Sequence, residues 1–142
     1  MRRKIILVAL VLLVSMLGLV GCSKDSADPE GSDNKNPLNG TTWLRNDLAG
    51  EIVWGGKNQF RITFKNNSDF EILNIRNGEI KDLYHEGKYT FNGKTLTIPS
   101  KSRNGEEVKQ IIYELTNSRT LALKKSDGSL SNSSYDNYIK QD

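Results

Sequence analysis

A histidine next to a glutamate is the first candidate for acid–base chemistry in this chain. His85 precedes Glu86, and a histidine–carboxylate pair can transfer protons during catalysis. Adjacent residues of a strand point to opposite faces of a sheet, however, and no serine or cysteine nucleophile motif accompanies the pair. We interpret His85 as a partly exposed strand residue. The sequence therefore predicts no catalytic residue, and we expect a protein that is not an enzyme.

Metal and cofactor chemistry has equally little support. The segment 127–131, Asp-Gly-Ser-Leu-Ser, suggests a calcium loop, but such loops need alternating acidic residues and a closing glutamate. We interpret it as a turn. The chain has one Cys and one His, which excludes a zinc site of cysteines and histidines and also a disulfide framework. We predict no metal site and no cofactor.

Three residues on predicted loops are candidates for contact with a ligand or a partner. Trp54 lies among glycines 50, 55 and 56, and a large aromatic on a mobile loop suits such a contact. The alternative is that Trp54 packs back on the core. Lys101 and Arg103 lie on a second long loop. Trp43, at the start of the first strand, is interpreted instead as a buried plug of the fold.

Length and charge limit the other possibilities. The 142 residues suffice for one domain of ordinary size. Residues 1–21 contain three basic residues and no acidic one, so the other 17 basic residues balance all 17 acidic ones. A neutral remainder argues against a nucleic-acid partner, because that function needs a strongly positive surface.

The N-terminus predicts an exported, lipid-anchored protein. Residues 1–4 are basic, and residues 5–20 form an uncharged, apolar run, as in a secretory signal. Leu19-Val20-Gly21-Cys22 then resembles a bacterial lipobox, which implies a signal peptide over 1–21 and acylation of Cys22. Two or more acyl chains anchor a protein stably to a membrane.

Residues 22–37 are rich in Ser, Asp, Asn, Gly and Pro, a composition that predicts a flexible tether. We place the folded domain at 38–142. Ser23, following the cysteine in place of aspartate, is similar to lipoproteins sorted to the outer membrane of Gram-negative bacteria. We expect an outer-membrane lipoprotein on the periplasmic or the cell-surface face, two alternatives that stay open.

The domain shows the pattern of an antiparallel β-structure. Apolar residues alternate with polar ones, as Phe60, Ile62 and Phe64 do with Arg61 and Thr63, and turn residues recur every 10 to 15 positions. No segment has a helical repeat. We predict an all-β, small up-and-down antiparallel barrel of about eight strands, at 41–46, 59–65, 70–76, 80–91, 94–99, 107–116, 120–125 and 135–141.

An ordered series of motifs resembles the lipocalin-like lipoprotein domains common in Bacteroidetes. The series covers most of residues 40–125 and consists of Gly40-Thr-Thr-Trp43, Gly87-Lys-Tyr89-Thr-Phe91, Leu96-Thr-Ile98, Tyr113-Glu-Leu115-Thr and Leu121-Ala-Leu123. The resemblance implies a small β-barrel and names no ligand. The runner-up is the META-type stress lipoprotein domain, whose Gly-Cys-Asn signature is absent.

Successive connections of an up-and-down barrel alternate between its two ends, which predicts that the two ends of this barrel differ. The short connections 66–69, 92–93 and 117–119 share one end with both termini of the domain, here called the tight-turn end. The long connections 47–58, 100–106 and 126–134 lie at the other, the loop-rich end, which we expect to face away from the membrane and to carry function.

Two functions remain open from the sequence, besides a purely structural lipoprotein. One is binding of a small apolar ligand in or at the mouth of the barrel. The alternative is a protein-contact module, an inhibitor or an accessory subunit of an outer-membrane complex, with a filled barrel. Interior volume discriminates between them, because a barrel of eight strands holds either packed side chains or one small ligand.

Overall fold

The structure of the protein, a computed structural model, describes residues 35–102, 104 and 108–142. Within it, Lys35–Asp142 forms one compact unit. The predicted signal peptide 1–21, the lipidation site Cys22, the tether up to residue 34 and the contact residue Arg103 lie outside the described residues. Asn36, at the end of the predicted tether, donates a hydrogen bond to the Tyr89 hydroxyl over 2.8 Å.

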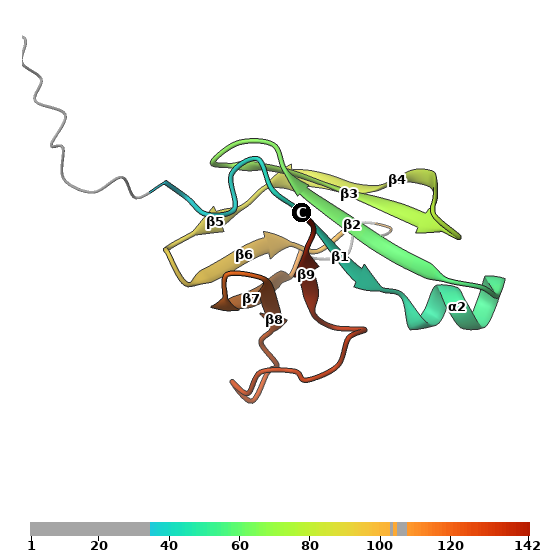
Figure 1. Cartoon of the computed structure of the whole chain (residues 1–142). Helices are drawn as coiled ribbons and strands as arrows, with labels where there is room; N and C mark the ends of the chain where they lie inside the picture. The colour runs from blue at the N-terminus through green and yellow to red at the C-terminus, as the bar shows by residue number, and fades with distance from the viewer. Residues whose placement is uncertain (1–34, 103, 105–107) are drawn as a thin grey trace, which may run out of the picture. The chain divides into compact units, whose positions relative to one another are not determined.

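The strands of the described part form one antiparallel sheet that curls into a nearly closed barrel (Figure 1). The order across the sheet is β4-β3-β2-β1-β9-β8-β7-β6-β5. The predicted fold class is therefore confirmed. The strands are β1 (Thr42–Asn46), β2 (Asn58–Phe64), β3 (Asp69–Arg76), β4 (Glu79–Lys88), β5 (Thr90–Phe91), β6 (Thr95–Pro99), β7 (Gln110–Asn117), β8 (Thr120–Leu123) and β9 (Tyr138–Lys140).

The predicted strand 80–91 divides in two because its halves have different partners. β4 pairs with β3, whereas β5 pairs with β6 through Phe91 opposite Leu96. The chain changes partner at Tyr89, whose ring is buried in the core. The division raises the strand number of the described part from the predicted eight to nine.

Two kinds of contact close the barrel. The first and last strands pair, with Leu44 opposite Ile139. At the other side, β4 faces β6 across a seam without a continuous ladder, and the His85 Nε2 lies 3.0 Å from the Pro99 carbonyl. A carbonyl only accepts a hydrogen bond, so His85 carries its proton on Nε2 and donates it across the seam.

The two ends of the barrel differ in the length of their connections, as the alternation of connections predicted. The connections 65–68, 92–94 and 118–119 are short and share the tight-turn end. The connections 47–57, 100–109 and 124–137 are long and share the loop-rich end with the hairpin at Asn77-Gly78. Both residues of that hairpin have positive φ, 51° and 84°, as a two-residue hairpin turn requires.

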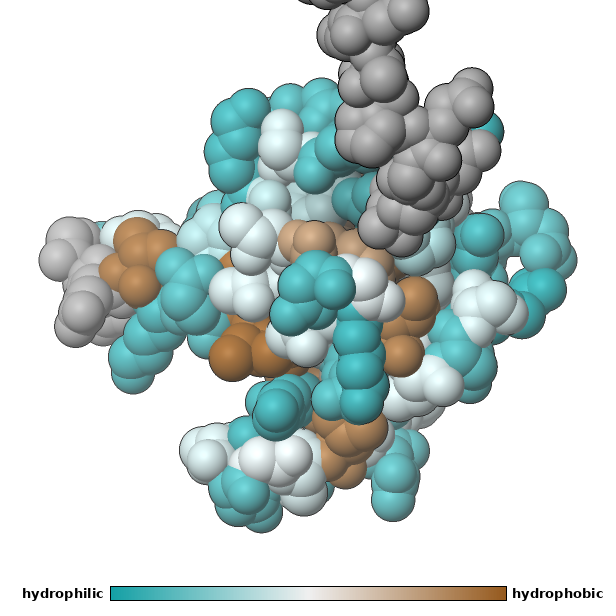
Figure 2. Space-filling model, turned by 90° about the vertical axis from the view of Figure 1, so that its left-hand side faces the viewer, coloured by the Kyte–Doolittle hydropathy of each residue, from teal (hydrophilic) through white to brown (hydrophobic). Residues whose placement is uncertain are grey.

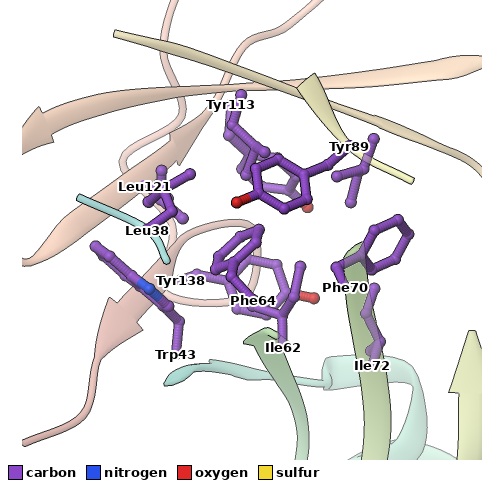
Figure 3. Packing of buried hydrophobic residues seen from close by; sticks show 12 residues of the cluster. Leu38, Trp43, Ile62, Phe64, Phe70, Ile72, Tyr89, Tyr113, Leu121 and Tyr138 are labelled. Atoms are coloured by element: carbon purple, nitrogen blue, oxygen red, sulfur yellow. The ribbon is translucent and has the colours of Figure 1, made fainter. Parts of the chain in front are cut away.

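Aromatic rings fill the interior near the tight-turn end (Figure 3). Phe64 is the last residue of β2 and Phe70 is the second residue of β3, close to the turn 65–68, and both are at most 1% exposed. The Phe64 and Tyr89 rings meet edge to face with centroids 4.8 Å apart. The predicted plug, Trp43, is 1% exposed, and its Nε1 donates to Thr41 Oγ1 over 2.7 Å. This half of the barrel is a packed core.

The expectation that no segment is helical was wrong for α2 (Leu48–Trp54), a helix of seven residues between β1 and β2. It starts with the bond from the Glu51 amide to the Asp47 carbonyl and ends at Gly55, where φ is 70°. Its larger apolar residues face outward, so the chain shows no helical repeat of core positions. No helix in the described part has the length and apolarity to cross a membrane.

Candidate functional site

A cavity of about 280 Å³ opens at the loop-rich end of the barrel. One side of its lining is aliphatic, with Ile72, Ile98, Ile111 and Leu123. These residues come from β3, β6, β7 and β8, so opposite walls of the barrel contribute to one surface. The core cluster continues to this end through Tyr113 and Tyr138, whose side chains form part of the cavity wall.

The other side of the cavity is polar and contains a cation from β1. Trp43 and Arg45 lie on the same face of β1, opposite Ile62 and Phe60 of β2. The strand alternation that buries Trp43 therefore also turns Arg45 inward. Its guanidinium carbon lies 5.1 Å from the centroid of the Phe60 ring and 5.2 Å from that of Tyr138.

The charge of Arg45 is held in a mostly apolar environment. Its Nε atom is buried and has no hydrogen-bond partner among the described residues. Burial opposes the charged form, but interactions with Tyr138, Tyr113 and the Asp47 carboxylate outweigh it, and the pKa of Arg45 is raised. Arg45 is therefore a permanent cation at the cavity wall.

Three tyrosines surround this cation. Tyr113 and Tyr138 meet edge to face with ring centroids 5.5 Å apart. Tyr84 packs on Phe60, and the centroids of these two rings lie 4.6 Å apart. Burial raises the pKa of Tyr113 and, further, that of Tyr138. Both phenols stay protonated at neutral pH, so their hydroxyls remain hydrogen-bond donors.

A β-bulge brings two consecutive residues of β4 to the cavity. Ile72 pairs with His85 and Leu73 pairs with Leu83, which leaves Tyr84 as the extra residue of β4. A bulge interrupts the alternation of side chains, and both Tyr84 and His85 line the cavity. His85 is a strand residue, as expected, and its Nε2 lies 3.0 Å from the Pro99 carbonyl oxygen.

Of the two predicted contact residues that the structure describes, Lys101 lines the cavity and Trp54 does not. Its Nζ lies over the Tyr84 ring, 4.7 Å from the centroid. Trp54 is at the end of α2, 62% exposed, and its ring contacts the Arg76 guanidinium at 4.6 Å. Trp54 is thus neither packed on the core nor part of the cavity, and Arg103 lies outside the described residues.

Arg45 and the tyrosines at 84, 113 and 138 were not predicted as site residues. The alternation of β1 contained a signal for Arg45, because a charged residue two positions after an inward-facing Trp43 also faces inward. Tyr113 was noted only within the motif Tyr113-Glu-Leu115-Thr. No sequence signal marked Tyr84, since a bulge depends on the pairing of two strands.

Other hollows of the surface do not have this character. A larger depression of about 480 Å³ lies at the tight-turn end, between Gly40–Thr42, Ser118, Arg119 and Lys140–Asp142, and none of its lining residues is buried. The side of the molecule that carries β5 is mostly hydrophilic, with small separate hydrophobic areas (Figure 2). The cavity with Arg45 is therefore the strongest candidate site in the described part.

Comparison with known proteins adds no identification. No family model, no curated protein and no solved structure matches this chain.

Proposed function

We propose that this protein binds one small amphipathic molecule in the cavity at the loop-rich end. The observation that carries the proposal is the half-filled interior. Packed rings occupy the tight-turn end, whereas a cavity of about 280 Å³ with an aliphatic and a polar side remains at the other end. Typical pockets for drug-sized ligands span roughly 300–1,000 Å³, so the ligand is small.

The lining modifies the expectation of a purely apolar ligand. Arg45, Lys101 and three tyrosines contribute polar atoms, opposite aliphatic side chains. A few polar groups in a mainly apolar pocket orient a ligand and give specificity. The ligand should therefore have one polar group and an apolar body.

We also propose that the protein is a lipoprotein anchored at Cys22, in the outer membrane, on the periplasmic or the cell-surface face. The support is the signal-like N-terminus with its lipobox-like motif. The compact unit begins at Lys35 and enters the fold at the tight-turn end, where the Gly40 amide bonds to the Phe64 carbonyl. The cavity opens at the opposite, loop-rich end of this unit.

Native mass spectrometry tests the ligand proposal. The full-length protein is purified from its own host in mild detergent, beside Ile111→Trp, which adds bulk inside the cavity. Ile112→Trp is the matched control, because Ile112 lies on the opposite face of β7. We expect a small-molecule adduct on the wild type and on Ile112→Trp but not on Ile111→Trp. No adduct on any, or the same adduct on all three, contradicts the proposal.

A second candidate function has its own support in α2. Ile52, Val53 and Trp54 are 75%, 66% and 62% exposed, and clustered exposed apolar residues are typical of contact surfaces. A protein-contact function would use this surface, not the cavity. A photo-crosslinker at Val53 in intact cells should then give a discrete product that Trp54→Ala removes. The same product from a crosslinker at Lys94, in a tight turn, would count against it.

A further inference from the structure

We infer that the ligand is an organic monocarboxylate and that Arg45 binds its carboxylate. The inference rests on the proposed function and adds the chemical class of the ligand. It comes from the charges of the cavity, from the shape of the guanidinium group and from the size of the apolar side.

Arg45 is a partly buried cation that belongs to no ion pair among the described residues. Its charge is favoured by Tyr138, by Tyr113 and, from beyond ion-pair distance, by Asp47. Its Nε atom is nevertheless buried without a hydrogen-bond partner among the described residues. A ligand anion would supply a counter-charge in direct contact with the guanidinium.

The charged residues of the cavity lining are all positive. The described residues that line it include two cations, Arg45 and Lys101, and no aspartate or glutamate. Asp47 interacts electrostatically with Arg45, and Asp136 with Tyr113, but neither lines the cavity; Asp136 accepts a hydrogen bond from Ser131 Oγ at 2.5 Å. The potential inside the cavity is therefore positive, which repels amines and attracts anions.

The polar groups of the cavity match a carboxylate. A guanidinium group is a planar fork that binds a carboxylate through two parallel hydrogen bonds. Tyr113 and Tyr138 line the same cavity with Arg45. Arg45 is partly buried whereas Lys101 is exposed to solvent, so the cavity wall itself holds one desolvated positive charge, which a monocarboxylate balances better than a doubly charged phosphate ester does.

The apolar side of the cavity limits the size of the remainder of the ligand. The aliphatic side chains of Ile72, Ile98, Ile111 and Leu123 form the opposite wall, and burying apolar surface there contributes about 25 cal/mol per Å². A cavity of about 280 Å³ accommodates a short aliphatic or single-ring body. A long acyl chain does not fit inside it.

The test compares phenylacetate with phenylacetamide, which has nearly the same shape but no charge. Binding to the full-length protein in neutral detergent is measured by calorimetry, with empty micelles as the blank. We expect the wild type to bind the acid at least about tenfold more tightly, since hydrogen bonds to charged groups contribute about 1.5–3 kcal/mol. Arg45→Gln should remove this preference and leave amide binding unchanged, while Lys88→Gln, at the surface, should keep it.

The outcomes separate the inference from the proposed function. If both probes bind equally and Ile111→Trp blocks both, the cavity binds ligands but the carboxylate inference is overturned. The same holds if phenethyl phosphate binds more tightly than phenylacetate. If neither probe binds the wild type, the proposed function fails with the inference. Should Arg45→Gln not fold, Lys101→Gln replaces it, and it should weaken acid binding but not amide binding.

Discussion

At the tight-turn end of the barrel, side chains from opposite walls meet in a packed core, whereas at the loop-rich end similar strands enclose a cation and a cavity. Phe64 and Arg45 represent the two regions, because both point inward from neighbouring strands. Phe64 meets the Tyr89 ring, while Arg45 has two rings beside it and no ion pair with any described carboxylate. The first arrangement stabilises the fold, and the second keeps a charge available for binding.

Phe64→Ala should give the largest loss of stability. Phe64 is completely buried, and truncating a buried phenylalanine typically costs about 3–5 kcal/mol. Phe60→Ala, on the same strand but half-buried beside the cavity, should cost clearly less. Urea unfolding followed by fluorescence measures both. Equal shifts of the two midpoints would show that the two regions do not differ in packing.

Alkaline pH should weaken the fold through the buried tyrosines. Burial raises the pKa of Tyr138 above its ordinary value near 10 in the folded state, so its contribution to stability is complete below pH 10. Above that pH the unfolded chain loses the proton first. The free energy of unfolding then falls by up to about 1.4 kcal/mol per pH unit for this residue.

Tyr138→Phe provides the control for this effect. The variant has no phenol to ionise at this position, so its stability should decline less steeply between pH 10 and the folded-state pKa of Tyr138. Urea midpoints measured along that alkaline series compare the two proteins. Parallel curves would mean that Tyr138 does not titrate as its burial implies.

Arg45→Met should lower stability by about 1 kcal/mol, clearly less than Phe64→Ala. The pKa of Arg45 is raised, so the interactions with Tyr138, Tyr113 and Asp47 favour its charge in the folded state. The substitution keeps a flexible stem but removes the charge and its contacts with the Phe60 and Tyr138 rings, and a cation–π contact contributes about 0.5–2 kcal/mol. Thermal melts of both variants against the wild type check the order. A loss as large as that of Phe64→Ala would assign Arg45 to the packed core.

Trp54→Ala should have the smallest effect, within about 0.5 kcal/mol, because substitutions at exposed positions rarely cost more. Its ring is 62% exposed and contacts Arg76 at the surface. Trp43→Ala is the matched comparison and should cost several-fold more. If both tryptophan variants lost the same stability, α2 would have to be part of the core.

The strands and their facing were largely predictable from the sequence. Ile62 and Phe64 alternate with Arg61 and Thr63, and Asn77-Gly78 marks a hairpin, because side-chain period and turn preference are local properties. The helix α2 escaped prediction since its apolar residues face outward and Gly50 alone is buried. Gly50 lies so close to Asp47 and Asn58 that a Cβ would come within 3.0 Å of the Asn58 Cβ, which local pattern does not reveal.

The candidate site was predictable only in part. Lys101 was identified from its place on a long loop, and it lines the cavity. Trp54 was singled out for its type and its glycine neighbours, but the structure places it on α2, away from the cavity. Arg45 could have been found by parity from Trp43, although nothing in β1 alone shows that no acidic residue would face it.

The sequence by itself determined the all-β class, the antiparallel meander and the division into a tight-turn end and a loop-rich end. Each of these follows from patterns within a single strand or turn. The tertiary structure decided which side chains surround the cavity. The bulge that brings Tyr84 beside His85 arises from the pairing of β3 with β4, and Arg45 meets Tyr138 because the last strand returns to the first. Contacts between strands distant in sequence depend on register and closure, and these are properties of the whole barrel.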